Sequence, residues 1–175
     1  MKIIWAPWRA KYIADIKKEQ KCFICEAVKS TDDKNSLVLL RGKFSIVIMN
    51  RYPYNTGHMM ISPIRHIQFP YEMTVEEMNE VMSLIAKMSK VINNLFSPGG
   101  LNIGVNIGKA AGAGEEHLHF HVVPRWNGDT NFIAVFDNTR VLPSSLESTY
   151  EKIKKELENV WAQSINKYWQ VLKIT

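Results

Sequence analysis

The alternation of apolar and polar residues divides the chain into strand-like and helix-like segments. Residues 36–50 contain two β-branched apolar runs separated by a glycine turn, which is typical of a β-hairpin. Residues 56–63 predict a third strand that ends at Pro63. Residues 101–107 alternate strictly, with an apolar face opposite a face formed by Asn102, Gly104 and Asn106.

Two segments show the longer spacing of amphipathic helices. In residues 74–96, Thr74 and Glu77 form a capping box. The apolar residues that follow recur at helical spacing and are expected in the core: Met78, Val81, Met82, Ile85, Met88, Ile92 and Leu95. A second helix, capped by Ser144 with Glu147, carries another apolar face, formed by Leu146, Tyr150, Ile153, Leu157 and Trp161.

The order of strands, helix, strands and helix, with short connections, predicts the fold class. It favours an α+β domain with an antiparallel sheet of about five strands and two main helices over a parallel, doubly wound sheet. At 175 residues the chain is expected to form a single domain, 1–175. We expect its core at about 20–135, with an N-terminal segment 1–19 and a C-terminal helical segment 144–175 as extensions.

Composition narrows the class of partner. The chain is 46% hydrophobic and 22% charged, as in soluble globular proteins. No apolar run approaches the ~20 residues of a membrane span, and the N-terminus lacks a secretory pattern, so we expect a cytoplasmic protein without a membrane partner. A net charge of +5 suits an anionic ligand such as a nucleotide, although any basic soluble surface would show it. Nucleic-acid binding is disfavoured, because no basic stripe is interleaved with aromatic residues.

Candidate chemistry concentrates in EEHLHFHVVPRW, residues 115–126, which holds three of the five histidines. Residues two apart on a strand share a face, so His117, His119 and His121 are expected to point together, opposite Leu118 and Phe120. This pattern is compatible with two functions. Two or three of the histidines could ligate a metal, or one could be a nucleophile that the others assist.

A glycine-rich loop, residues 108–116, leads into these histidines. Its glycines would let the backbone approach an anion and offer N–H groups to it. The loop matches neither of the established nucleotide-binding glycine motifs. Followed directly by three histidines, it favours phosphate chemistry.

The only cysteines, Cys22 and Cys25, form the motif CFIC. A pair this close in a cytosolic chain indicates metal binding or redox chemistry rather than a structural disulfide. No strand-like segment precedes Cys22, as a thioredoxin-like redox motif would require, so metal binding is favoured.

Several segments of the chain resemble those of a known family. HLHFHVV fits the His-φ-His-φ-His-φ-φ signature of the histidine triad (HIT) superfamily of nucleotide hydrolases and transferases. Segments 47–66 and 106–117 resemble the same family. The WAPWRAKYI start, the CFIC motif and PRWNGDTNF resemble the branch of bacterial diadenosine tetraphosphate phosphorylases and hydrolases, near the fragile histidine triad proteins. The resemblance covers residues from about 5 to 135.

The resemblance implies a role for each matching residue. His119 would be the nucleophile that forms a nucleotidyl-histidine intermediate, His121 would bond the α-phosphate oxygens, and His117 would lie near the leaving group. The implied substrate-binding residues are Asn50 at the ribose, Asn106 near the phosphates, and the phosphate loop of Gly112, Ala113, Gly114 and Glu115. Relatives commonly have Ser or Thr at the position of Gly114, so a hydroxyl donor is missing here.

The resemblance also implies a zinc site, a dimer and alternative activities. Some bacterial relatives bind structural zinc through positions that correspond to Cys22, Cys25, His66 and His117, and relatives form homodimers. The implied function is hydrolysis or phosphorolysis of dinucleoside polyphosphates at the α-phosphate. A nucleoside phosphoramidate hydrolase and a non-catalytic nucleotide- or zinc-binding protein stay open as alternatives. His58 either orients the histidine cluster or is a satisfied core residue.

Overall fold

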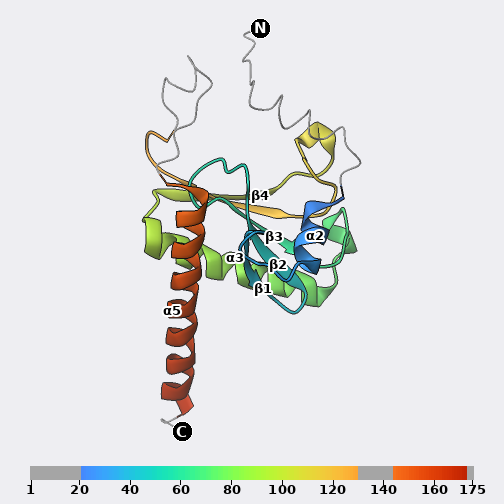
Figure 1. Ribbon diagram of the computed structural model, residues 1–175. Coiled ribbons are helices and arrows are strands. Elements are labelled where there is room, and N and C mark those ends of the chain that lie inside the picture. Colours follow the sequence, from blue (N-terminus) through green and yellow to red (C-terminus); the bar gives the residue numbers. More distant parts are fainter. Residues whose placement is uncertain (1–20, 130–143, 173–175) are drawn as a thin grey trace.

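The computed structural model describes residues 21–129 and 144–172, with side chains as far as residue 160 (Figure 1). The N-terminal segment 1–19, with the WAPWR motif, lies outside this range. Five strands form one antiparallel sheet in the order β1-β2-β3-β5-β4, which confirms the predicted α+β fold. The strands are β1 (Val38–Arg41), β2 (Ser45–Met49), β3 (Met59–Pro63), β4 (Gly100–Val105) and β5 (Phe120–Arg125).

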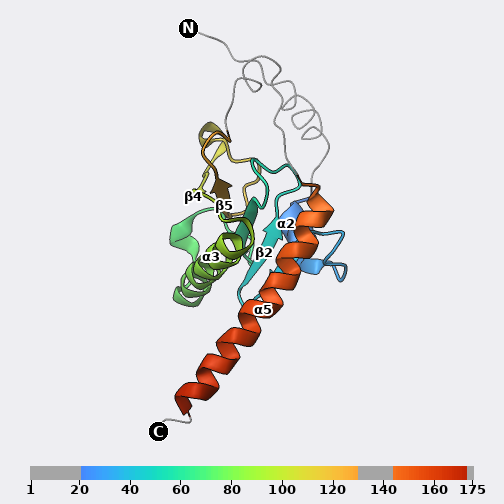
Figure 2. The same ribbon diagram turned by 90° about the vertical axis from the view of Figure 1, so that its left-hand side faces the viewer.

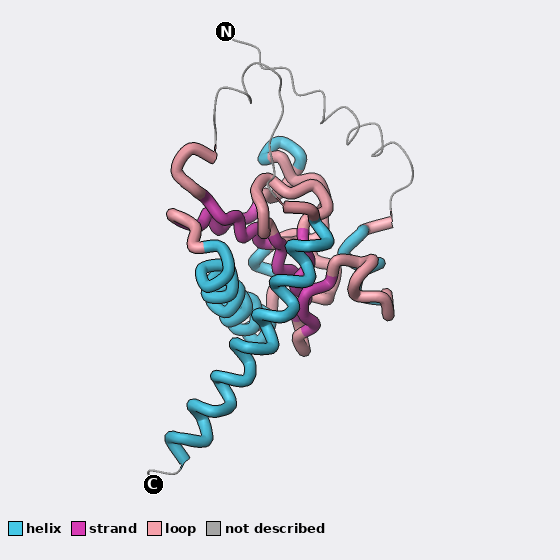
Figure 3. The backbone as a smooth tube through the Cα atoms, turned by 60° about the vertical axis from the view of Figure 1, so that its left-hand side comes forward, coloured by secondary structure: helices cyan, strands magenta, loops and turns pink. Residues whose placement is uncertain are grey.

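Two long helices pack beside the sheet. They are α3 (Val75–Phe96) and α5 (Leu146–Leu172), which contact each other and lie on the same side of the strands (Figures 2 and 3). A short helix, α2 (Phe23–Lys29), was not predicted, and two 3-10 turns complete the fold, η1 (Pro70–Glu72) and η2 (Lys109–Ala111). Within the described residues, no helix is long and apolar enough to cross a membrane.

The start of α3 and most of its buried face agree with the prediction from the sequence. Thr74 accepts a hydrogen bond from the N–H of Glu77 at 3.2 Å, and the Glu77 carboxylate accepts one from the N–H of Thr74 at 2.8 Å, so the predicted capping box is confirmed. The core prediction is wrong for Met78 and Met82, whose side chains are 43% and 62% exposed. The buried face of α3 is formed by residues that exclude both methionines, namely Glu77, Val81, Leu84, Ile85, Met88, Val91 and Ile92.

The first half of α5 also belongs to the core. Its cap is Ser145 rather than the predicted Ser144, because the Ser145 hydroxyl accepts the N–H of Ser148 at 3.2 Å. The buried apolar residues of this half are Tyr150, Ile153, Leu157 and Val160. The Trp161 side chain lies outside the described residues. The division of the chain into a core and two extensions stays a prediction.

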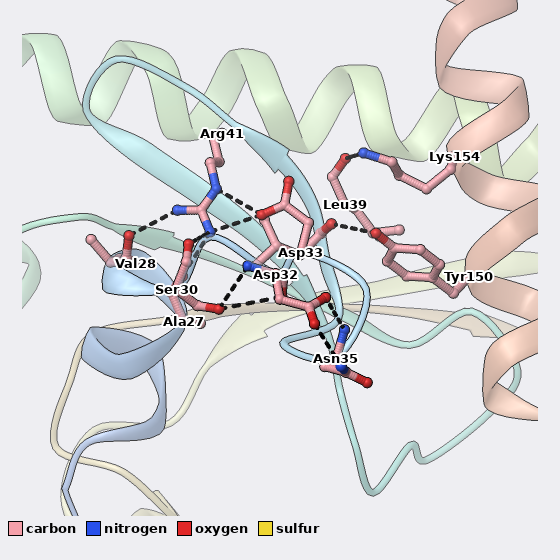
Figure 4. A network of polar contacts seen from close by, with 11 residues as sticks. Ala27, Val28, Ser30, Asp32, Asp33, Asn35, Leu39, Arg41, Tyr150 and Lys154 are labelled. Carbon is pink, nitrogen blue, oxygen red and sulfur yellow. Dashed lines mark hydrogen bonds and ion pairs between the residues drawn. The ribbon is translucent and has the colours of Figure 1, made fainter.

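A polar network joins α2 and α5 to the edge of the sheet (Figure 4). At the end of β1, the Arg41 guanidinium donates to Asp33 at 2.9 Å and to three carbonyls at the end of α2, those of Ala27, Val28 and Ser30. On the other side, the Tyr150 hydroxyl donates to the carbonyl of Val38 at 3.0 Å. Helix α2, which follows Cys22, is therefore fixed to the sheet through Arg41.

Candidate active site and metal site

The histidine segment is divided by the start of β5. This strand begins at Phe120, so only His121 lies on it, and the expectation of one strand beneath all three histidines is wrong. Before Phe120 the chain forms no ladder pair with β3, whose pairing with β5 spans only residues 59–61. Instead, the N–H of Leu118 donates to the carbonyl of Ile67 at 2.7 Å. This contact places His117 next to the segment that carries His66.

His117 is fully buried and turned toward the cysteines. Its Nε2 lies 2.9 Å from the carbonyl of Pro63, which can only accept, so Nε2 carries the hydrogen and Nδ1 is left with a lone pair. That Nδ1 lies 3.4 Å from the Sγ of Cys22 and 3.5 Å from the Sγ of Cys25. Burial lowers the pKa of His117 to about 4, so the imidazole is neutral and able to act as a ligand.

His66 completes a group of four metal-binding side chains. Its Nδ1 lies 3.2 Å from the Sγ of Cys25, and the ligand atoms of Cys22, Cys25, His66 and His117 all lie within 4.8 Å of one another. In a tetrahedral zinc site, ligand atoms are about 3.3–3.8 Å apart, given the usual zinc–sulfur and zinc–nitrogen bond lengths. The two thiols and two imidazoles therefore fit a tetrahedral metal. Burial raises the pKa of Cys22 to about 11, so metal binding would have to displace its proton.

His119 has the opposite orientation. Its Nδ1–H donates to the carbonyl of His117 at 2.7 Å, which leaves the lone pair on Nε2. The residue is 4% exposed, and burial lowers its pKa below that of an ordinary histidine. Its ring meets that of His121 edge to face, with the centroids 4.8 Å apart. His119 thus presents a neutral, oriented nitrogen, which is what nucleophilic catalysis by histidine requires.

His58 fixes the orientation of His121. The N–H of Tyr54 donates to Nδ1 of His58 at 3.1 Å, so the hydrogen of His58 is on Nε2, and this atom lies 2.9 Å from Nδ1 of His121. His121 must accept that bond, and its own hydrogen is therefore on Nε2. Burial, and then the proximity of His119, lower the pKa of His121 to about 4. Of the two roles considered for His58, the structure supports the orienting one.

A cavity of about 300 Å³ adjoins His121 on the polar face of β4 and β5. Of the predicted substrate-binding residues, Asn106 and His121 line it. The other lining residues are Tyr54, Asn55, Asn102, Ile103, Gly104, Val123, Arg125 and Asp129. Sequence reasoning did not select Asn102 or Arg125 as site residues. The polar face of the alternating segment 101–107 was the available signal, because it places Asn102 and Asn106 on one side.

The other predicted substrate-binding residues lie around the cluster. Asn50 follows β2, and its side-chain oxygen accepts the N–H of Tyr52 at 2.8 Å. In the glycine-rich loop, the N–H groups of Gly112 and Ala113 donate within the loop, to Lys109 and Gly108. The N–H groups of Gly114 and Glu115 have no such partner among the described residues. The loop can therefore offer fewer donors to an anion than its composition indicates.

Comparison with known proteins identifies the family of this chain. The family model described as HIT domain matches residues 31–128. An AP-4-A phosphorylase of Mycobacterium tuberculosis is 37% identical over 168 residues, which cover 91% of this chain and 84% of that protein. The chain belongs to the HIT family. An asymmetrical bis(5'-nucleosyl)-tetraphosphatase of Schizosaccharomyces pombe is 32% identical over 94 residues, or 54% of this chain and 52% of that protein.

Solved structures of the HIT family have the same fold. The crystal structure of a Zn-bound histidine triad family protein from Mycobacterium smegmatis superposes with a TM-score of 0.66. The match covers 82% of this chain and 97% of that one, at 21% sequence identity. At this identity the likeness supports the HIT fold of the chain.

Proposed function

We propose that the chain is a nucleotidyl hydrolase or transferase that acts at the α-phosphate of dinucleoside polyphosphates such as diadenosine tetraphosphate. The observation that carries this proposal is the orientation of two neighbouring imidazoles, with a lone pair on Nε2 of His119 and a hydrogen on Nε2 of His121. One nitrogen can attack phosphorus while the other donates to a phosphate oxygen. The names of the relatives, an AP-4-A phosphorylase and a bis(5'-nucleosyl)-tetraphosphatase, support this substrate class.

The proposed reaction has two displacements. In the first, the lone pair of His119 Nε2 forms a bond to the α-phosphorus, and the bond from that phosphorus to the bridging oxygen breaks. The leaving nucleotide departs with the electron pair on that oxygen. In the second, an oxygen of water or inorganic phosphate attacks the same phosphorus, its proton is released, and the nitrogen–phosphorus bond returns its electron pair to His119. His121 stabilises the negative charge that develops on the phosphate oxygens.

The remaining contacts are those that the resemblance to the family implies, and they are part of the proposal. Asn50 would contact the ribose, through its amide nitrogen because its oxygen is already bonded. Asn106 would donate to the phosphates, and the N–H groups of Gly114 and Glu115 would bind phosphate oxygens. Because Gly114 brings no hydroxyl, its backbone has to supply that contact.

We also propose that Cys22, Cys25, His66 and His117 hold a structural zinc ion. Two thiolates and two imidazoles at the observed separations suit zinc, and a protein of the same fold is described as Zn-bound. The ion would cross-link α2, the segment after β3 and the segment before β5. His117 would then be a ligand, and no step of the reaction is assigned to it.

A cytoplasmic homodimer without nucleic-acid or membrane partners completes the proposal. Strand β4 is at the edge of the sheet, where an exposed strand can pair with a second copy. The Ile103 side chain, which is 49% exposed, lies on this strand. Light scattering of the purified protein tests the homodimer, with the mass of two chains as the expected result.

Product analysis tests the proposed activity. The protein is incubated with diadenosine tetraphosphate, with and without inorganic phosphate, and the products are separated by chromatography. ADP and ATP formed only with phosphate indicate a phosphorylase, whereas AMP and ATP indicate a hydrolase. An adenosine 5'-phosphoramidate tests the alternative activity, since the same nucleophile would serve. Binding of nucleotide without turnover of any adenylylated compound would leave a non-catalytic binding protein and overturn the proposal.

A further inference from the structure

Gly104 stands in the middle of β4, where the fold does not require a glycine. Its φ is not in the left-handed region, and a Cβ built on it meets no atom within 4 Å. Side chains are favoured over glycine in strand interiors, so this position forgoes stability that a residue such as valine would supply. Gly104 pairs directly with His121 and lines the cavity beside it. A glycine here keeps the space next to His121 open.

The groove over Gly104 is bordered by hydrogen-bond donors. Asn106, Gly104 and Asn102 line the cavity from β4 and the residue after it, and Arg125 lines it from β5. The Nη1 group of Arg125 donates to the side-chain oxygen of Asn102 at 2.8 Å, which assigns the Asn102 amide nitrogen as a donor with no partner among the described residues. Arg125 has five N–H groups and uses three of them on Asn102 and Asp129. Donors therefore remain at both ends of the groove.

The single carboxylate in the lining, that of Asp129, does not turn the groove into a cation site. Both of its oxygens are taken up by protein donors, namely the Arg125 guanidinium, the Asn55 amide at 2.8 Å and the N–H of Trp126 at 3.2 Å. Its charge is balanced by Arg125 in a bidentate pair. What the groove offers to a ligand is N–H groups, and such groups match the oxygens of a phosphate chain.

We propose that this groove holds the polyphosphate chain of the leaving nucleotide, from the α-phosphate beside His121, across Gly104, to Asn102 and Arg125. The inference rests on the proposed nucleotidyl transfer to His119 and specifies where the departing half of the substrate lies. Arg125 is four positions after His121 along β5, a length of about 13 Å. Asn102 and Arg125 are thus placed to contact phosphates distal to the bond that breaks, and the groove favours long polyphosphates over short ones.

Two substrates that donate the same adenylyl group test the groove. Diadenosine tetraphosphate leaves ATP, which the groove should hold, whereas adenosine 5'-phosphoramidate leaves ammonia, which needs no groove. In Gly104→Val the added side chain fills the space above Gly104 in the groove. We expect kcat/KM for the tetraphosphate to fall about 100-fold, as misplacement of a substrate by about 1 Å can cause. For the phosphoramidate we expect a change of less than about threefold. Equal losses on both substrates, or no loss on the tetraphosphate, would overturn the inference.

Gly99→Ala is the control. Gly99 immediately precedes β4, a Cβ there meets only backbone atoms at ordinary contact distance, the carbonyl oxygen of Arg125 at 3.6 Å and the backbone nitrogen of Asn127 at 4.0 Å, and the residue does not line the groove. We expect it to change neither rate. Light scattering checks that both variants keep the wild-type mass. If Gly104→Val fails to fold, Gly104→Ala and Asn102→Ala take its place, with smaller losses in the same direction and a lowered preference for the tetraphosphate over the triphosphate.

A binding measurement tests, independently of turnover, whether the groove holds the polyphosphate chain. Titration calorimetry compares ATP, whose β- and γ-phosphates would enter the groove, with AMP, which has none. We expect Gly104→Val to weaken ATP binding about tenfold, equivalent to about 1.4 kcal/mol, and to leave AMP binding unchanged. An unchanged affinity for ATP would overturn the groove assignment. A wild-type protein that turns over neither substrate would instead contradict the proposed function, and the ATP comparison would still test the groove.

Discussion

The histidine triplet divides into two parts with different surroundings. We call His117 the metal half, and His119 with His121 the catalytic half. His117 turns its Nδ1 toward Cys22 and Cys25, because the carbonyl of Pro63 holds the hydrogen on the other nitrogen. In His119 and His121 it is Nδ1 that is bonded, to a carbonyl and to the His58 ring respectively, which leaves Nε2 as the other nitrogen. One residue type in one short segment thus supplies a nitrogen to the candidate metal site on one side, and the proposed nucleophile with its helper on the other.

This difference shows that the hydrogen-bond partners of an imidazole determine which of its two nitrogens is available to a metal or a substrate. Burial lowers the pKa of each of the three rings, so the direction of the pKa shift does not distinguish them. What differs is which nitrogen is bonded to the protein and which is left over. The halves are also joined, since the carbonyl of His117 orients His119. A change in the metal half should therefore reach the catalytic half only through this contact.

The largest effect is expected from His119→Ala, which removes the catalytic half alone. Without the nucleophile, turnover of diadenosine tetraphosphate should fall by about 10⁴-fold or more. The zinc content, measured by atomic absorption, should stay at the wild-type value because no ligand is lost. Turnover near the wild-type rate would show that another group attacks the phosphate.

His58→Ala tests the support of His121. Loss of the hydrogen bond at 2.9 Å frees the ring of His121, and we expect kcat to fall by roughly 100-fold, as for other misplacements of about 1 Å. The effect should appear in kcat more than in KM, because His121 acts on charge that develops during the reaction. Asn55→Ala is the comparison variant, because it removes a cavity-lining side chain that donates to Pro124 and Asp129 and not to the histidines, and it keeps the Asn55 carbonyl that accepts the N–H of His58. An equal loss in both variants would point to general damage of the fold.

Cys25→Ser removes one ligand of the metal half. Zinc content should fall to near zero, and the loss of a structural ion should lower the free energy of unfolding by about 3 kcal/mol, or the melting temperature by roughly 10 °C. Activity should fall less, about tenfold, because His119 is reached only through the carbonyl of His117. Full zinc content in Cys25→Ser, together with loss of zinc in His121→Ala, would mean that the metal is held by the triad itself.

The smallest effect is a shift of the pH profile. Burial lowers the pKa of His119 and brings that of His121 to about 4, from 6.5 in an exposed histidine. Since His119 attacks as the neutral base, activity is lost as the pH falls through its folded-state pKa, and the acid limb of kcat/KM should lie below pH 6.5. The contribution of His121 to stability is fully present above pH 6.5 and is lost as the pH falls toward 4. An acid limb at or above pH 6.5 would contradict the buried, neutral assignment.

Local patterns in the sequence predicted the features that depend on local structure. The capping box of Thr74 and Glu77, the hairpin of β1 and β2 and the five-stranded antiparallel sheet are confirmed. The contacts of Cys22 and Cys25 with His117 span about ninety residues, and no rule of sequence spacing reaches that far. Only the resemblance to the family implied that the two cysteines lie close to His66 and His117.

Other features depend on contacts that periodicity cannot reveal. Alternation continues through His117 and His119 although the ladder between β3 and β5 does not extend to them, so the pattern placed the start of β5 too early. The methionines of α3 follow helical spacing, but Met82 is not part of the buried face of the helix. The tautomers of the histidines follow from carbonyls and rings distant in sequence, such as Pro63 and His58.

The central claim, that His119 forms the covalent bond to the nucleotide, is tested most directly by isolating the intermediate. Wild-type protein is mixed with diadenosine tetraphosphate, quenched in alkali within one turnover, digested and analysed by mass spectrometry. We predict one adenylyl group on the peptide that contains His119, and none on this peptide in His119→Ala. An adenylyl group on a different residue, or full turnover in His119→Ala, would contradict the account.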